Sequence, residues 1–499
     1  MFSRVALIAL LFGFAAVEMQ VRGALASRPN IVVLIADDMG WDDCGPYGNR
    51  RVRTPNIDRL AREGMKFDRA FVTCSSCSPS RASIMTGRYP HNTDAEQLHW
   101  PLPRAQVTFV EKLKAAGYWT AAAGKWHVGN EVKDRFDAVA EAGTAGFQLP
   151  SGPNARRAGM IAEQDESGCG NWLPALQSRP KEKPFFLWLA ALDPHRDYKL
   201  NTIPNPHKPE QVIVPPYLLD SPEVRRDLAL YYDEITRLDR FIGKILDELE
   251  AQGVATNTLV IFMADNGRPF PRCKTTVYDS GIKTPFIVRW PAKAQAGSQC
   301  ASLISSIDIA PMLLEVAGVE PPKTFQGRSF AKLFADPSQK IRDHIFAERN
   351  WHDYDAHGRA ARTERFKYIR NFDANLPNTP PADAVRSPTF QAMRRLAQVA
   401  ELPPELLVCF RKPKPAEELY DIERDPHELR NIADDPAHAE TLKGLRERLE
   451  RWQRETDDPM PGLRNPDEFD RETGEPLPNR KRPRLSKQEL LSHMKAKTP

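Results

Sequence analysis

The chain has 499 residues, of which 27% are charged and 41% are hydrophobic. This length and composition exclude a single small module, a disordered polyelectrolyte and a membrane bundle, and they suffice for a sizeable buried core. Lys and Arg number 70 and Asp and Glu 66, and the resulting net charge of +4 argues against nucleic-acid binding by the protein as a whole.

The first 26 residues have the pattern of a secretory signal peptide. Arg4 precedes an uncharged apolar run over residues 5–17, and Ala24-Leu25-Ala26 offers small residues at the cleavage spacing. The run is shorter than the roughly 20 residues that a membrane-spanning helix needs. The sequence therefore predicts an exported protein without a membrane span, whose mature chain begins near Ser27.

Cysteine count and glycosylation signals bear on the compartment. The seven cysteines leave at least one thiol without an intramolecular disulfide partner. No Asn-x-Ser/Thr acceptor occurs in the chain, which is unusual for a long protein of a eukaryotic secretory pathway. We therefore expect a bacterial periplasm or exterior rather than a lysosome.

Four apolar runs of strand length are each followed, directly or within a few residues, by polar residues. The runs cover 30–36, 118–123, 184–190 and 258–264, and they lead to Asp37-Asp38, Gly124-Lys125-Trp126-His127, Asp193-Pro194-His195 and Asp265-Asn266-Gly267. Near-continuous hydrophobic strands are buried on both faces, as in a mainly parallel sheet flanked by helices. Ligand sites in such α/β sheets lie at the carboxyl ends of the strands, so the four polar groups are expected to converge.

Helices and a second sheet complete the expected organisation. Ser221 and Pro222 begin an amphipathic helix that ends before Gly253. After about residue 365, strand-like alternation in 365–370 and 418–421 and a helix from about 436 to 452 predict a smaller, antiparallel α+β domain. The predicted units are a signal peptide (1–26), a catalytic domain (27–365), a smaller C-terminal domain (366–460) and a polar, basic, Pro-rich tail (461–499), which we interpret as solvated rather than polyanion-binding.

The stretch Cys77-Ser78-Pro79-Ser80-Arg81 resembles the signature of the sulfatase family. A second stretch, from Gly117 to Lys125-Trp126-His127, is similar to the family's second signature, and the order and separation of the two also fit. The resemblance implies an alkaline-phosphatase-like α/β fold. It also implies that a formylglycine-generating enzyme oxidises Cys77 to formylglycine during maturation.

The chemistry of sulfate transfer agrees with this assignment of Cys77. A thiol or hydroxyl that attacked sulfur would leave a covalent sulfate that water must displace at a hindered centre. In a hydrated aldehyde, one geminal oxygen attacks and the second later expels sulfate by re-forming the carbonyl. Conversion of Cys77 also accounts for the odd number of cysteines.

Carboxylate and amide side chains provide ligands for one divalent cation. All-oxygen ligation favours calcium or magnesium over zinc. The family resemblance implies Ca²⁺ held by Asp37, Asp38, Asp265, Asn266 and the formylglycine oxygen at position 77.

Cationic and imidazole side chains are the candidates for charge stabilisation and proton transfer. An anionic transition state needs positive charge, and the candidates are Arg81, Lys125 and Lys274, although Arg272 could replace Lys274. By resemblance, His127 removes the proton from the geminal hydroxyl. His195 matches the group that protonates the leaving atom.

Motifs from about Pro29 to Pro459 are most similar to the sulfamidase (heparan N-sulfatase) branch of the family. They include Lys125-Trp126-His127-Val128-Gly129, Asp193-Pro194-His195-Arg196, Asp265-Asn266-Gly267-Arg268-Pro269-Phe270-Pro271 and Ser387-Pro388-Thr389-Phe390. The predicted substrate is therefore a sulfated saccharide, first the N-sulfate of glucosamine. The alternatives are an O-sulfatase on another sulfated polysaccharide, a metal-dependent phosphatase or phosphodiesterase, and an inactive carbohydrate-binding protein. His99, His352 and Asp353 are candidate sugar contacts or plain loop residues.

Overall fold

The computed structural model describes residues 28–142, 166–458 and 465–478. The predicted signal peptide and residues 461–464 and 479–499 of the predicted tail lie outside the described residues. Within the described ranges, no helix is both long enough and apolar enough to cross a membrane.

An eight-stranded sheet with the order β5-β4-β6-β1-β7-β8-β2-β9 forms the centre of the molecule. Its strands are β1 (Asn30–Ala36), β2 (Met65–Phe67), β4 (Trp119–Gly124), β5 (Ala138–Glu141), β6 (Phe185–Ala190), β7 (Thr258–Ala264), β8 (Phe286–Arg289) and β9 (Ser298–Cys300). The central strands β4, β6, β1 and β7 are parallel and buried throughout, as their continuous apolar sequences predict. β8 runs antiparallel to both of its neighbours, so the sheet is mixed but mostly parallel.

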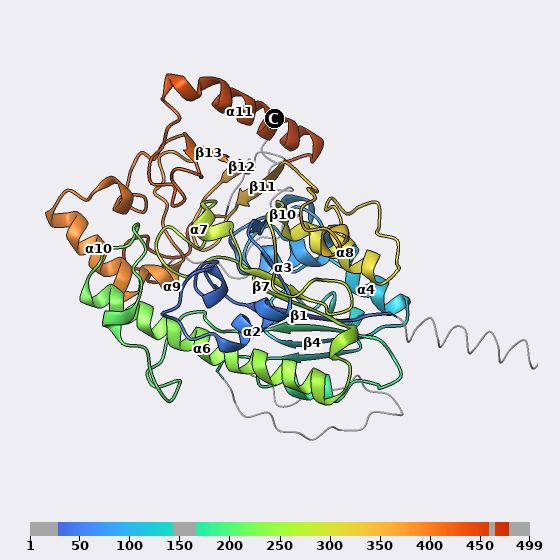
Figure 1. The fold of residues 1–499 in the computed structure, drawn as a ribbon. Helices are drawn as coiled ribbons and strands as arrows, with labels where there is room; N and C mark the ends of the chain where they lie inside the picture. The colour runs from blue at the N-terminus through green and yellow to red at the C-terminus, as the bar shows by residue number, and fades with distance from the viewer. Residues whose placement is uncertain (1–27, 143–165, 459–464, 479–499) are drawn as a thin grey trace, which may run out of the picture.

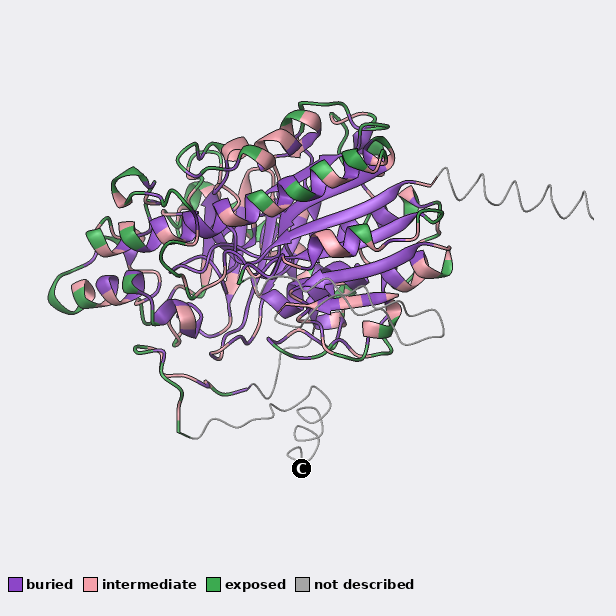
Figure 2. Cartoon of the chain, turned by 90° about the horizontal axis from the view of Figure 1, so that it is seen from below, coloured by how far each residue is buried: buried purple, intermediate pink, exposed green. Residues whose placement is uncertain are grey.

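Helices cover both faces of this sheet (Figures 1 and 2). Alternate residues of β1 point to opposite faces of the sheet and belong to two hydrophobic cores. Val32 and Leu34 pack with α2 (Pro55–Glu63), α5 (Trp172–Gln177) and α6 (Pro222–Ala251). The odd-numbered residues from Ile31 to Ile35 pack with α3 (Cys77–Thr86), α4 (Phe109–Ala115) and α8 (Ile309–Val316). The expected three-layer α/β arrangement is confirmed.

The capping signal at the start of α6 is also confirmed. Ser221 precedes the helix and its Oγ accepts a hydrogen bond from Val224 N at 3.4 Å, with Pro222 in the first turn. Tyr231 and Tyr232 on this helix are buried, as a packing role requires.

A separate four-stranded antiparallel sheet contains β11 (His344–Arg349), β12 (Gly358–Thr363), β13 (Phe366–Asn371) and β14 (Glu417–Asp421) in that order. Helix α11 (Ala439–Glu455) covers it through Leu445, Leu449 and Trp452. The shorter elements are β3 (Ala70–Phe71), β10 (Ile304–Ser305), α7 (Asp279–Ile282), α9 (Ala382–Val385) and α10 (Pro388–Val399). Helix α10 packs on α6, so the C-terminal part of the chain borders the main sheet (Figure 1).

Residues 465–478 lie against the body of the protein. Trp351 Nε1 donates to Pro466 O at 3.0 Å, and Asp355 N donates to Asp467 Oδ1 at 2.7 Å. The domain limits expected from the sequence remain predictions.

Candidate active site

The polar residues after the parallel strands meet at the carboxyl edge of the main sheet. Backbone hydrogen bonds align the strand ends: Asp37 N donates to Asp193 O at 2.9 Å, and Asp265 N donates to Ala36 O at 3.1 Å. The side chains of Asp37, Asp38 and Asp265 are fully buried. The expected convergence of β1, β6 and β7 is therefore present in the fold.

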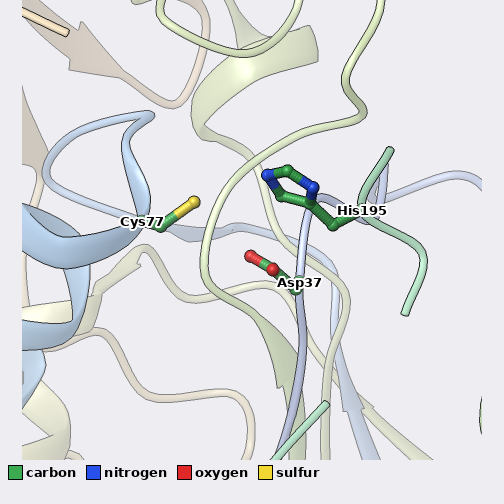
Figure 3. Close-up of side chains that lie close together, drawn as sticks. All are labelled: Asp37, Cys77 and His195. Carbon is green, nitrogen blue, oxygen red and sulfur yellow. The ribbon is translucent and has the colours of Figure 1, made fainter. Parts of the chain in front are cut away.

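Cys77 is the first residue of α3 and faces this group of carboxylates. Its Sγ lies 3.7 Å from Asp38 Oδ1, and the ligand atoms of Cys77, Asp37, Asp38 and Asp265 all lie within 4.8 Å of one another. Figure 3 shows the sulfur of Cys77 pointing toward Asp37 and His195, which come from separate strand ends. Burial, reinforced by the charge of Asp37, raises the pKa of the Cys77 thiol well above its usual value. An unmodified thiol here stays protonated and is a weak nucleophile.

The residues fit a hard divalent cation. Three carboxylates crowd together, and burial raises the pKa of Asp265 despite the nearby charge of Arg81. Two buried oxygens, Asp37 Oδ1 and Asn266 Oδ1, accept no hydrogen bond from any residue that the structure describes and remain available as ligands. A cation with oxygen ligands would offset the carboxylate charge and satisfy both atoms.

Cationic side chains surround the carboxylates. Lys125 Nζ contacts Asp37 Oδ2, and Lys274 Nζ lies 2.7 Å from Asp38 Oδ2. Arg272 instead stacks on the ring of Tyr278, with its guanidinium carbon 4.1 Å from the ring centroid. Of the two residues that the sequence left open, Lys274 is therefore the one beside the carboxylates.

His127 follows β4 and pairs with a loop residue. Its Nε2 lies 2.6 Å from His99 Nδ1. Burial, with the positive charge of Lys125 next in size, holds the pKa of His127 well below its usual value. A neutral imidazole at this position is able to accept a proton.

His195 borders the open side of the site, with 30% of its side chain exposed. Its Nδ1 contacts the carbonyl oxygen of Arg196, which leaves Nε2 facing the carboxylates, 3.6 Å from Asp38 Oδ2. Two hydrogen bonds of 2.8 and 2.7 Å join the guanidinium of Arg196 to Asp227 on α6 and fix this loop.

Three further residues lie at the site from segments outside the two signature motifs. Asp383 on α9 has its Oδ2 3.8 Å from His195 Nε2, and the sequence analysis did not single it out. His352 Nδ1 lies 2.8 Å from the Oγ of Ser76, next to Cys77, and His99 contacts His127. The Ser387-Pro388 motif lies four residues after Asp383 and is the sequence feature near it that the family resemblance includes.

All seven cysteines are buried, and no disulfide joins any two of them. Cys74 lies close to Cys77 in sequence, yet its Sγ contacts Ser76 O at 3.9 Å, and no disulfide joins the two. Cys77 is therefore not committed to a structural bridge.

Comparison with known proteins identifies the family. The model of the family described as Sulfatase matches residues 29–319 of this chain. The chain belongs to the sulfatase family. A second model, described as N-sulphoglucosamine sulphohydrolase, C-terminal, matches residues 272–377 of this sulfatase.

Two relatives align over most of this sulfatase. It is 32% identical to an ulvan-active sulfatase of Formosa agariphila over 474 residues, which span 86% of this chain and 75% of that protein. It is 31% identical to human N-sulphoglucosamine sulphohydrolase over 480 residues, which span 88% of this chain and 93% of that enzyme. The chain is therefore a hydrolase of sulfate esters or sulfamates, in a family that generally uses formylglycine and a divalent metal.

Solved structures support the fold. A protein in complex with its substrate D-glucosamine-2-N,6-O-disulfate superimposes with a TM-score of 0.64 at 21% identity, covering 89% of this sulfatase and all of that chain. The phosphonate monoester hydrolase of Agrobacterium radiobacter superimposes with a TM-score of 0.61 at 18% identity, covering 86% of this sulfatase and 96% of that chain. The alkaline-phosphatase-like fold expected from the sequence is confirmed.

Proposed function

We propose that this sulfatase releases sulfate from a sulfated saccharide, with the N-sulfate of a terminal glucosamine as its substrate. The observation that carries the choice of substrate is the alignment with human N-sulphoglucosamine sulphohydrolase, which includes 93% of that enzyme. The match to the C-terminal model of the same enzyme over residues 272–377 supports it.

The geometry suits attack on sulfur from position 77. Formylglycine formed from Cys77 supplies a geminal oxygen nucleophile and a built-in means of expelling sulfate afterwards. Lys125 and Lys274 neutralise charge on the sulfate oxygens, and Arg81 fixes the carboxylates from behind. His195 Nε2, on the open side, protonates the leaving atom, and neutral His127 takes the proton of the geminal hydroxyl.

The proposed metal is Ca²⁺, held by Asp37, Asp38, Asp265, Asn266 and the oxygen at position 77. When bound, the ion supplies Lewis-acid polarisation and charge neutralisation at the reacting oxygens. In the part of the chain that the structure describes, each cluster able to hold a metal includes at most one histidine. That donor set favours a hard cation over the zinc pair of a phosphatase.

The second candidate function is that of an O-sulfatase on another polysaccharide. The alignment with an ulvan-active sulfatase, at 32% identity over 86% of this chain, favours it. We expect sulfate release from glucosamine N-sulfate in a panel of defined N- and O-sulfated saccharides. Release from O-sulfated members alone would replace the first function by the second.

The state of Cys77 provides a separate test. Mass spectrometry of the peptide that contains Cys77 should find the aldehyde in active enzyme, formed by a formylglycine-generating enzyme. Cys77→Ser should abolish nearly all turnover without loss of the fold, because the change is small and local. An active enzyme with only an unmodified thiol would exclude the proposed nucleophile.

The proposed location is the periplasm or the extracellular space, after removal of residues 1–26. The signal-peptide pattern at Arg4 and Ala24-Leu25-Ala26 supports this proposal. N-terminal sequencing of the secreted protein should begin near Ser27. An intact N-terminus in the active enzyme would contradict export by this route.

A further inference from the structure

The carboxylate of Asp383 reaches the candidate active site from a distant part of the chain. Its Oδ2 lies 3.8 Å from His195 Nε2, the ring nitrogen that we propose protonates the leaving atom. The Asp383 side chain is 17% exposed, so it borders the open part of the site rather than its buried floor. Asp383 takes no part in the proton transfers proposed for His195 and His127.

Asp383 lies near one proposed metal ligand, Asp38, but outside the cluster that contains Cys77. Asp383 clusters with Asp38 and His195, whereas the group that contains Cys77 takes its carboxylates from Asp37, Asp38 and Asp265. A substrate sulfate is anionic and must lie next to position 77, where another carboxylate would repel it. Because Asp383 lies beside His195 Nε2, the proposed proton donor, we place it on the side of the leaving group.

The segment that carries Asp383 is fixed to the same anchor as the His195 loop. Asp383 Oδ1 accepts a hydrogen bond of 2.7 Å from Ala384 N, which leaves Oδ2 directed toward His195. Thr389 Oγ1 donates at 2.5 Å to Asp227 Oδ2, and Asp227 also holds Arg196. This shared contact sets the spacing between Asp383 and the proton donor.

The charges around Asp383 keep it ionised. Burial raises the pKa of Asp383, but Lys274, His195, Arg196 and the hydrogen bond from Ala384 N together lower it by more and hold it below its ordinary value. An ionised carboxylate at the leaving-group side binds a cation or a strong hydrogen-bond donor.

We propose that Asp383 is the substrate-binding carboxylate that receives the amino group released from an N-sulfated amino sugar. This inference rests on the proposed N-sulfatase function. As the sulfur–nitrogen bond breaks, sulfur bonds to the oxygen nucleophile at position 77 and the electron pair of the broken bond stays on nitrogen. The attacking hydroxyl releases its proton to solvent, nitrogen takes one proton from His195 Nε2, and the free amine takes a second proton from the bulk solvent, so that the resulting ammonium group donates to Asp383. A hydroxyl released from an O-sulfate remains neutral and gains less from the carboxylate.

Binding of the product tests the contact directly. Asp383→Asn keeps the shape and the acceptor for Ala384 N but removes the charge. In calorimetric titrations of the mature enzyme with glucosamine, the variant should bind about 10- to 100-fold more weakly than wild type. N-acetylglucosamine carries no charged amine, so its affinity should be the same in Asp383→Asn and wild type. The exposed control Asp434→Asn should bind both sugars as wild type does. Equal glucosamine affinity in wild type and Asp383→Asn would overturn the proposal.

Steady-state kinetics distinguish a direct contact between Asp383 and the amine from a role of Asp383 in positioning His195 or Lys274. Asp383→Asn should lower kcat/KM for glucosamine N-sulfate about 10- to 100-fold and leave 4-nitrophenyl sulfate turnover within about 3-fold. Equal losses on both substrates would assign Asp383 to positioning and overturn the proposal.

If wild type releases no sulfate from the sulfamate, the proposed function fails, and glucosamine binding still decides the role of Asp383. If the Asn variant does not fold, Asp383→Glu serves instead, because it keeps the charge. This variant should still bind glucosamine more tightly than N-acetylglucosamine. Loss of that preference would contradict the contact between Asp383 and the amine.

Discussion

Arg81 and Asp265 form a fully buried ion pair beneath the candidate nucleophile. Nε and Nη2 of Arg81 lie 2.9 and 2.8 Å from the same oxygen of Asp265, and neither side chain is exposed. The pair joins the signature helix α3 to the end of β7, and Nη1 of Arg81 also donates to Lys125 O at 2.9 Å. One side chain thereby connects three segments that are distant in sequence.

Removal of the Arg81 guanidinium should destabilise the fold as well as the site. Arg81→Ala leaves the buried Asp265 carboxylate without its counterion, a change that costs about 3–5 kcal/mol in comparable pairs. Denaturant unfolding measures the loss in free energy of unfolding. The exposed Arg62→Ala serves as control and should change it by less than about 0.5 kcal/mol. An Arg81→Ala variant as stable as this control would show that the pair does not hold the segments together.

Asp38 should control metal content. Asp38→Ala removes one proposed ligand and the partner of Lys274, so bound calcium and activity should fall together. Elemental analysis of the purified protein gives the metal content, with Asp434→Ala at an exposed position as the matched surface control. Stoichiometric zinc in active wild type, or full calcium in Asp38→Ala, would contradict the proposed ligand set.

Loss of the His195 imidazole should lower turnover more for a substrate whose leaving group is more basic. A sugar amine or alkoxide needs a proton as it departs, whereas an aryl sulfate leaves as a stabilised phenoxide. His195→Ala should therefore lower turnover of the sugar substrate about 10²–10⁴-fold and affect 4-nitrophenyl sulfate much less. His127→Ala should slow both substrates, because sulfate expulsion follows departure of the leaving group. Equal losses in His195→Ala would remove the general-acid assignment.

A buried histidine at the boundary with the antiparallel sheet should make stability depend on pH. His91 Nδ1 lies 2.6 Å from Glu348 Oε1. Burial lowers the pKa of His91, but the charge of Glu348, its hydrogen bond to His91 and the charge of Asp458 together raise it by more, and the net shift is upward. A raised pKa in the folded state stabilises the protein fully below the unfolded value of about 6.5, and this contribution disappears as the pH rises through the folded-state pKa.

The variant His91→Gln should reveal this pH dependence. Its loss in free energy of unfolding relative to wild type should be larger near about pH 5.5 than near about pH 9, and on the order of 3 kcal/mol at the lower pH. The half-buried His438 provides a control in His438→Gln. A loss that grows with rising pH would show that His91 is neutral in the folded protein.

The sequence by itself determined the four central parallel strands of the main sheet, the long helix and the family. Residues 30–36 and 258–264 are apolar at every position but their first, and such runs become strands buried on both faces wherever they lie in the chain. Ser221 and Pro222 mark the start of α6 through local hydrogen bonding and a fixed backbone angle. Cys77 and Arg81 are recognisable because the signature places many specified residues within a short stretch.

Only the tertiary structure decided which side chains meet across segments. Lys274 lies beside Asp38 while Arg272, two residues earlier, stacks on Tyr278, because the direction of each side chain depends on the packing of the loop after β7. Asp383 lies beside His195 because α10 packs on α6, a contact that hydrophobic periodicity does not specify. Local sequence patterns encode hydrogen bonding and burial within an element, whereas distances between elements depend on how their surfaces pack in the folded chain.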